Sequence, residues 1–145
     1  MTMEVKEILV PIDFSDVSQA ALEFAVVVAE RFDAEMHVLH VDDDPILNAP
    51  TTSDDFRQES SDKSKQQLDQ LLDQQVKQGL RMVLAARCST DTTQAILDYI
   101  EEFNVDLIVM GAKGRSALAN MLMGSVAEDL MRKAPCPVIT IRKPD

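Results

Sequence analysis

Residues 105–126 read VDLIVMGAKGRSALANMLMGSV, and this stretch decides the fold. It opens with a nearly continuous apolar run, which is typical of a parallel strand covered on both faces. Three of the four glycines in the chain, Gly111, Gly114 and Gly124, follow this run. A helical pattern then begins near Val126. A buried strand that passes through a glycine-containing loop into a helix indicates an α/β fold.

The rest of the chain repeats this alternation. Apolar, β-branched runs predict strands at five places, namely 5–12, 34–41, 80–87, 105–110 and 137–142. Helical spacing of apolar residues lies between them. The first helix carries such a stripe at Val17, Ala20, Ala21, Phe24, Ala25, Val28 and Phe32. The alternation predicts one α/β domain over residues 1–145, with a parallel sheet and helices on both faces.

Local signals predict where the helices begin and end. Ser15 is a candidate N-cap of the first helix, and Asp91 or Thr90 is a candidate cap of the third. The second helix should end near Gly79, and Pro135 should end the last one. Residues 42–62 are predicted as an acidic loop leading into the second helix, whose first turn and outer face would carry Asp54, Asp55, Glu59 and Asp62.

Composition excludes several classes of function. The formal net charge of −11 argues against nucleic-acid binding, which depends on Lys and Arg at phosphates. No apolar run reaches the ~20 residues of a membrane span, and the N-terminus lacks the features of a signal peptide. Cys88 and Cys136 are interpreted as small buried residues in a reducing compartment. We therefore expect a cytoplasmic protein without membrane insertion.

The candidate binding site lies where two strands end. In open α/β sheets, ligands bind beyond the carboxyl ends of the strands. The first strand ends in Pro11-Ile12-Asp13 and the fourth in Met110-Gly111. If these strands are neighbours, Asp13 faces the glycine loop across a crevice.

The loop also has the parts of an anion site. Lys113 and Arg115 supply positive charge, and the helix that begins at Gly124-Ser125-Val126 offers free N–H groups. On chemistry alone, the alternative stays open that Gly111 only turns the chain and Gly124 only begins a helix.

Other motifs do not fit. The glycine spacing is neither GxxxxGK[ST] nor GxGxxG, so neither a P-loop NTPase nor a dinucleotide fold is supported. His37 and His40 are three residues apart on a strand and should point to opposite faces, which argues against a shared metal. No Ser-His-Asp arrangement is present, so we expect no catalytic residue and no metal site.

A different spacing does match. Gly111 and Gly114 are separated by two residues, and nine residues then precede Gly124-Ser125. With the segments ILVPIDFS, VLHV and GSVAEDLMRKAPCPV, this pattern resembles the ATP-binding branch of the universal stress protein family. The resemblance implies a five-stranded parallel sheet of order 3-2-1-4-5, a Rossmann-like fold similar to the adenine nucleotide alpha hydrolases. One departure is CSTDTTQ at 88–94, where many members have a glycine-proline turn.

The resemblance also implies an ATP site. Asp13, with Pro11, would lie at the adenosine end, and the Val41 backbone would meet the adenine. The remaining positions follow the glycine motif: Met110 and Gly111 at the ribose and phosphates, Lys113 and Gly114 around the phosphates, and Gly124, Ser125 and Val126 at the helix start. Mg²⁺ would accompany the phosphates.

The implied function is a nucleotide-dependent stress regulator that acts on an unidentified protein partner. Family members dimerise through the last strand, here Val138, Ile139, Thr140 and Ile141. Two alternatives stay open. One is a slow ATPase or autokinase, and the other is a dimeric interaction module that binds no nucleotide.

Overall fold

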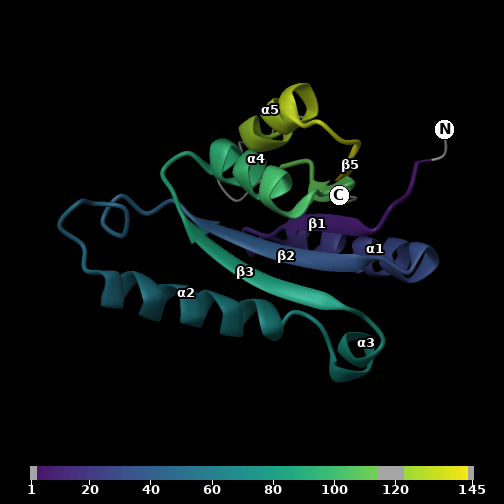
Figure 1. Cartoon of the computed structure of the whole chain (residues 1–145), viewed down its shortest axis with the longest axis horizontal. Helices are drawn as coiled ribbons and strands as arrows, with labels where there is room; N and C mark the ends of the chain where they lie inside the picture. The colour runs from purple at the N-terminus through teal and green to yellow at the C-terminus, as the bar shows by residue number, and fades with distance from the viewer. Residues whose placement is uncertain (1–2, 114–122, 144–145) are drawn as a thin grey trace.

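The computed structural model describes residues 3–113 and 123–143. Its five strands form one parallel sheet in the order β3-β2-β1-β4-β5 (Figure 1). This confirms the predicted strand order and places β1 beside β4. The strands are β1 (Glu7–Pro11), β2 (Glu35–Asp42), β3 (Met82–Cys88), β4 (Leu107–Gly111) and β5 (Val138–Ile141). The helices are α1 (Asp16–Phe32), α2 (Asp54–Asp69), α3 (Gln74–Gln78), α4 (Thr92–Phe103) and α5 (Ser125–Lys133).

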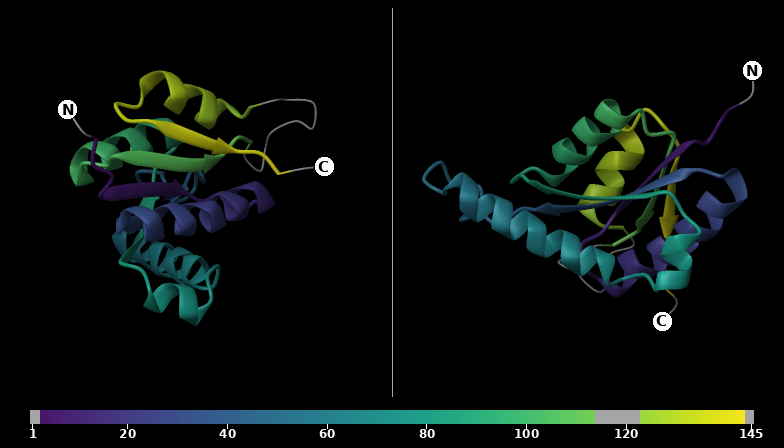
Figure 2. Two further views of the ribbon diagram at one scale, coloured as in Figure 1. Left: turned by 90° about the vertical axis from the view of Figure 1, so that its right-hand side faces the viewer. Right: turned by 60° about the horizontal axis from the view of Figure 1, so that its bottom comes forward.

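The sheet separates two apolar layers. On one face, Ile8, Val10 and Val38 pack with α1 and with Leu68 of α2. On the other face, Leu9, Leu39 and Ile108 pack with α4 and α5. Figures 1 and 2 show α4 and α5 on one side of the sheet and the other helices on the opposite side. Helices therefore cover both faces, as predicted.

Helix α1 buries a different stripe from the predicted one. Phe24 and Phe32 are exposed, whereas Leu22, Val26 and Ala29 are buried. Together with Ala21 and Ala25, the buried positions form a face rich in alanine. Small side chains let the helix approach the sheet closely, and the two aromatic rings are left on the outer side. The prediction that Phe24 and Phe32 lie on the inner face of α1 is therefore wrong.

The segment between β2 and β3 also differs from the prediction. Helix α2 begins at Asp54, inside the predicted 42–62 loop, and a break separates it from the short α3. The preceding turn is held by Arg57, whose Nε and Nη2 donate to the carbonyl oxygens of Leu47 (3.1 Å) and Ala49 (2.8 Å). Leu47 is buried beneath this turn. The loop is therefore organised by one arginine and one apolar anchor.

Four helices begin with a side-chain cap. Ser15, Ser53, Asp73 and Asp91 each accept a hydrogen bond from a first-turn N–H group of α1, α2, α3 and α4, respectively. This confirms Ser15 and selects Asp91 over Thr90. The N-cap residue of α5 is Gly124, which makes no side-chain cap, and the helix ends before Pro135, as predicted. Within the described ranges, no helix combines the length and the apolar character that a bilayer crossing requires.

Candidate functional site

The candidate site lies at the carboxyl edge of the central strands. β1 and β4 are parallel neighbours, with Ile8 opposite Leu107 and Leu9 opposite Ile108. Their last residues, Pro11 and Gly111, therefore lie at the same edge of the sheet. The chain leaves β1 toward α1 and leaves β4 toward α5 (Figure 2). This is the position at which open α/β sheets bind ligands, because the strand connections diverge there.

Asp13 organises the turn between β1 and α1. Its Oδ1 accepts hydrogen bonds from the Ser15 backbone N–H (3.0 Å) and the Ser15 hydroxyl (2.5 Å). Ser15 Oγ in turn accepts from the Ser18 N–H at 3.2 Å, which caps α1. The carboxylate at the end of an apolar strand thus has a structural partner, and it remains half-buried at the carboxyl edge.

Phe14 and His40 also shape this turn, a role that the sequence did not suggest for either residue. Phe14 has a φ of 65°, in the left-handed region that is uncommon for a bulky residue. Its ring centroid lies 4.7 Å from that of His40. His40 Nδ1 lies 2.8 Å from the Ile12 carbonyl oxygen, and a protonated Nδ1 donates to that acceptor. His40 therefore supports a strained turn directly behind Asp13, which no sequence motif reveals.

Val41 presents its backbone toward this crevice. In a β-strand, the N–H and C=O groups of alternate residues point to opposite neighbouring strands. The Leu39 carbonyl accepts from the Ile12 N–H at 2.8 Å, whereas the Asp42 carbonyl accepts from the Ser89 N–H at 3.0 Å. Val41 lies two residues after Leu39, so its backbone groups also point to the β1 side. They lie beyond the end of β1 at Pro11.

Gly111 is a glycine because α1 passes directly against it. A Cβ atom there would overlap the Val17 side chain and would lie 3.2 Å from the Val17 carbonyl carbon and 3.3 Å from the Ser18 nitrogen. None of the described glycines has a positive φ, so close packing, and not a left-handed turn, accounts for glycine at position 111. The preceding Met110 is buried in the layer beneath α4 and α5.

The two ends of the β4–α5 connection are tied together. The Gly124 N–H donates to the Ala112 carbonyl at 2.6 Å, and the Ala112 N–H donates to the Ile141 carbonyl at 2.8 Å. Gly124 is buried and precedes α5, Ser125 is exposed, and Val126 packs toward the core. The start of α5 is thereby held next to the end of β4, and its N-cap residue Gly124 provides no side-chain cap.

Most of the predicted site residues converge on this edge. The structure brings together the ends of β1 and β4 and the start of α5, and Lys113 lies half-buried two residues after β4 ends. Gly114 and Arg115 lie outside the described residues. The arrangement offers backbone donors and a lysine to an anion, a backbone edge at Val41 to a planar base, and the polar turn at Asp13.

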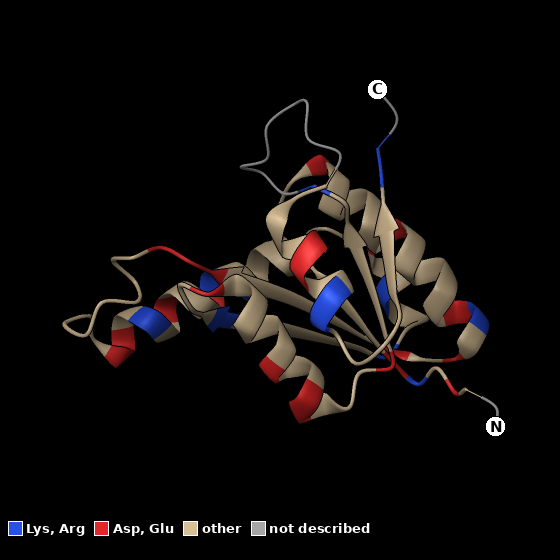
Figure 3. Cartoon of the chain, turned by 90° about the horizontal axis from the view of Figure 1, so that it is seen from above, with Lys and Arg blue, Asp and Glu red and all other residues tan. Residues whose placement is uncertain are grey.

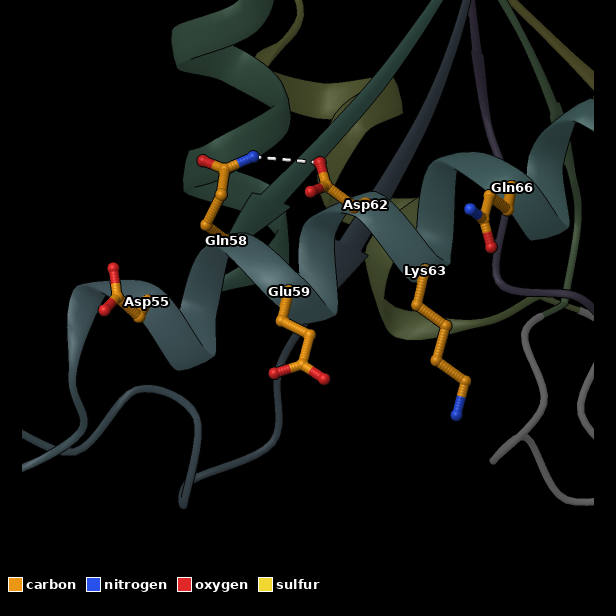
Figure 4. Close-up of a pocket in the computed structure, with 6 residues that line it drawn as sticks. All are labelled: Asp55, Gln58, Glu59, Asp62, Lys63 and Gln66. Atoms are coloured by element: carbon orange, nitrogen blue, oxygen red, sulfur yellow. Dashed lines mark hydrogen bonds between the residues drawn. The ribbon is translucent and has the colours of Figure 1, made fainter.

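Charge elsewhere does not mark a competing site for an anion. Lys and Arg total 14 against 25 Asp and Glu, and they are dispersed among the acidic positions (Figure 3). A shallow hollow runs along α2, lined by Asp55, Gln58, Glu59, Asp62, Lys63 and Gln66 (Figure 4). All six side chains come from one helix, and Gln58 Nε2 donates to Asp62 Oδ1 at 2.9 Å. This surface is the polar outer face predicted for the helix.

The two histidines do not meet. His37 is buried against Tyr99 of α4, whereas His40 contacts Phe14 on the other face of the sheet. The prediction that they point to opposite faces is confirmed. Cys88 and Cys136 are both free and half-buried. Burial raises the pKa of each thiol, and the nearby Asp42 carboxylate raises the pKa of Cys88 further.

Comparison with known proteins agrees with this architecture. Residues 4–142 match the model of the universal stress protein family. A universal stress protein of Methanocaldococcus jannaschii is 31% identical, over 96% of this chain and 83% of its own. The structure of UspA from Lactobacillus plantarum superposes with a TM-score of 0.75 at 33% identity, covering 97% of this chain and 100% of that one. A universal stress protein from Archaeoglobus fulgidus, solved in complex with dAMP, superposes with a TM-score of 0.66 at 20% identity, covering 97% and 99%. On the match over 4–142, the chain belongs to the universal stress protein family.

Proposed function

We propose that this chain binds ATP at the carboxyl edge of β1 and β4 and acts as a cytoplasmic, nucleotide-dependent regulator in a stress response. One observation carries the proposal. Among the described residues, the N-cap position of α5 is Gly124, which makes no side-chain cap, whereas the other four helices have one, and the Gly124–Ala112 hydrogen bond holds the start of α5 beside the end of β4. Uncapped N–H groups and the positive end of the helix dipole favour a phosphate at this position.

The surrounding residues fit the parts of ATP. The outward backbone edge of Val41 suits the adenine, whose ring edge carries both donors and acceptors. The turn at Pro11 and Asp13 suits the nucleoside. Met110, Gly111, Lys113, Gly114, Arg115, Gly124, Ser125 and Val126 would serve the ribose and phosphates. Mg²⁺ would be carried by the phosphate oxygens, as is usual for a hard cation that keeps most of its waters.

Nucleotide complexes of related folds support the choice of ligand. The solved structures with the same fold include one protein bound to dAMP and another bound to cAMP. Both ligands contain adenine joined to a sugar, the part of the nucleotide for which Val41 and Asp13 are proposed here. The triphosphate is proposed because Lys113 and the start of α5 offer two separate positive groups to a chain of phosphates.

The test is nucleotide binding by two matched variants. Mass spectrometry of small molecules released from the purified chain should detect ATP, and calorimetric titration should show one ATP per chain. Lys113→Ala should weaken affinity about tenfold, the effect of losing one charge-assisted contact. Lys133→Ala removes the same charge from the exposed far end of α5 and should leave affinity unchanged. Equal affinities of the two variants, or no ATP binding, would refute the proposal.

Dimerisation through β5 forms the second part of the proposal. β5 is at the edge of the sheet, and Pro137 and Ile141 direct their carbonyls to Ile108 and Ala112 on the β4 side. By strand alternation, Val138 and Thr140 direct their backbone groups outward. Thr140→Pro removes an outward donor and no β4 hydrogen bond. We expect light scattering to show a dimer for the parent chain and a monomer for Thr140→Pro.

A further inference from the structure

A buried histidine and two glutamates meet at the opposite edge of the sheet, where the strands begin. Glu7 starts β1 and Glu35 starts β2, and the two residues are register partners. His37 lies two residues after Glu35 and therefore points to the same face. The ligand atoms of Glu7, Glu35 and His37 all lie within 4.8 Å of one another. None of these residues belongs to the proposed nucleotide site.

From this geometry we propose that Glu7, Glu35 and His37 bind a divalent transition-metal ion such as Zn²⁺. His37 Nε2 lies 2.6 Å from Glu7 Oε2 and 3.8 Å from Glu35 Oε1. Bonds of about 2.0–2.1 Å in a tetrahedral site place ligand atoms about 3.3 Å apart. Each distance is within about 0.7 Å of that value. Rotation of the two glutamate side chains would bring their oxygens to this spacing around an ion.

The second nitrogen of His37 already has a partner that fixes the ring. Nδ1 lies 2.7 Å from the Tyr99 hydroxyl oxygen. Without metal, Nε2 donates its proton to Glu7 and the Tyr99 hydroxyl donates to Nδ1. With metal on Nε2, the neutral ring carries its proton on Nδ1 and donates it to the Tyr99 oxygen. A ligating histidine held through its other nitrogen is the usual arrangement in protein metal sites.

The surroundings hold these groups in place and leave a route to solvent. The His37 side chain is 2% exposed, and the rings of Tyr99 and Phe103 enclose it. Asp106 Oδ2 accepts the Glu7 N–H at 2.9 Å, which fixes the start of β1. The carboxylates of Glu7 and Glu35 remain 31% and 35% exposed, so an ion can enter from that side and keep a water ligand.

Charge and ligand type favour a transition metal over Mg²⁺. Two carboxylates in one cluster repel each other, and a divalent cation cancels both charges around a neutral imidazole. Imidazole nitrogen suits Zn²⁺ and its neighbours, whereas Mg²⁺ prefers six oxygen ligands. Three protein ligands leave one tetrahedral position for solvent. The site is therefore chemically different from the Mg²⁺ that would accompany ATP.

Titration of the nucleotide-free full chain with ZnCl₂ tests this proposal. One Zn²⁺ should bind per chain, and Co²⁺ in the same site should give visible absorption typical of a four-coordinate ion with a nitrogen ligand. Glu35→Gln should weaken Zn²⁺ binding at least tenfold, and Tyr99→Phe should weaken it about tenfold through loss of the hydrogen bond to Nδ1. His40→Gln, on the same strand and the other face, should bind as the parent chain does.

Glu35 is partly exposed, so the Glu35→Gln variant should fold. A loss of Zn²⁺ binding in this variant can then be attributed to the lost ligand and not to unfolding. Circular dichroism checks that it does. If parent, Glu35→Gln and His40→Gln bind Zn²⁺ equally, or if the parent shows no stoichiometric site, the proposal is overturned.

Discussion

The carboxyl and amino edges of the sheet present different chemical groups, backbone groups at the first and side chains at the second. At the carboxyl edge, the ends of β1 and β4 and the start of α5 expose backbone groups, and Gly111 makes room for α1. At the amino edge, the starts of β1 and β2 bring together side chains, centred on the buried His37. A site of backbone groups would suit the proposed nucleotide with its chain of phosphates, whereas a site of side chains would suit the proposed single ion. The difference also decides which substitutions each edge tolerates.

The largest effect is expected where α1 meets the carboxyl edge. Gly111→Ala forces a Cβ against the Val17 side chain and close to backbone atoms of α1 that cannot retreat. We expect a loss of about 3 kcal/mol in the free energy of unfolding, the upper range for overpacking. Urea denaturation measures it. Gly79→Ala is the control, since its Cβ would lie 3.8 Å from the Val76 carbonyl oxygen and meet no closer atom. Equal stability of the two variants would contradict close packing at Gly111.

A smaller loss is expected at the amino edge. Tyr99→Phe keeps the ring but removes the hydroxyl that pairs with Nδ1 of the buried His37. Leaving such a group unpaired costs about 1–3 kcal/mol. Thermal and urea unfolding should show this loss, while ATP affinity stays unchanged because the carboxyl edge is untouched. A change in ATP affinity of the folded variant would show that the two edges are coupled.

Asp13 should affect binding more than stability. Asp13→Asn keeps an oxygen that can accept from the Ser15 N–H, so the turn should survive. We expect about fivefold weaker ATP binding, equivalent to ~1 kcal/mol for one hydrogen bond to the nucleoside. Asp106→Asn makes the same change at the amino edge, where Asp106 accepts from Lys6 and Glu7. Its ATP affinity should equal that of the parent chain, as measured by calorimetry.

The smallest effect concerns one cysteine at each edge. Cys88 ends β3, and Cys136 lies before β5. Burial raises the pKa of both thiols, so at pH 9 iodoacetamide should alkylate them more slowly in the folded chain than in urea. Free thiols ionise near pH 8.5. The contribution of the two thiols to the free energy of unfolding is therefore complete below that pH. It declines as the pH rises through the higher pKa values that the thiols have in the folded chain. Equal alkylation rates in both states would exclude the shift.

The position of the carboxyl edge was largely predictable from the sequence. The tertiary contacts that hold it in place were not. Apolar runs that end in Asp13 and Gly111 locate the strand ends, because the fold places parallel carboxyl ends together. The contact of Gly111 with Val17 was not predicted, since it joins two segments that are distant in sequence. The contact of Phe14 with His40 was not predicted either, because a left-handed φ at a phenylalanine has no sequence signal.

The amino edge was missed altogether. His37 was weighed only against His40, its neighbour in sequence on the same strand. The sequence shows that Glu35 and His37 are two residues apart, so they should point to the same face of a strand. Glu7 comes close to them only because β1 pairs with β2. Tyr99 was not singled out from the sequence either, although the structure buries it in α4. Contacts between segments far apart in sequence depend on the register of the paired strands. The apolar pattern of a single sequence does not determine that register.

Amide chemical shifts recorded during ATP titration test the central claim most directly. If ATP binds at the carboxyl edge, the amide signals of Val41, Gly111, Gly124, Ser125 and Val126 should move with one common affinity. Those of Glu7, Glu35 and His37 at the amino edge should stay in place. Shifts centred on the amino edge, or no shifts at saturating ATP, would contradict the account.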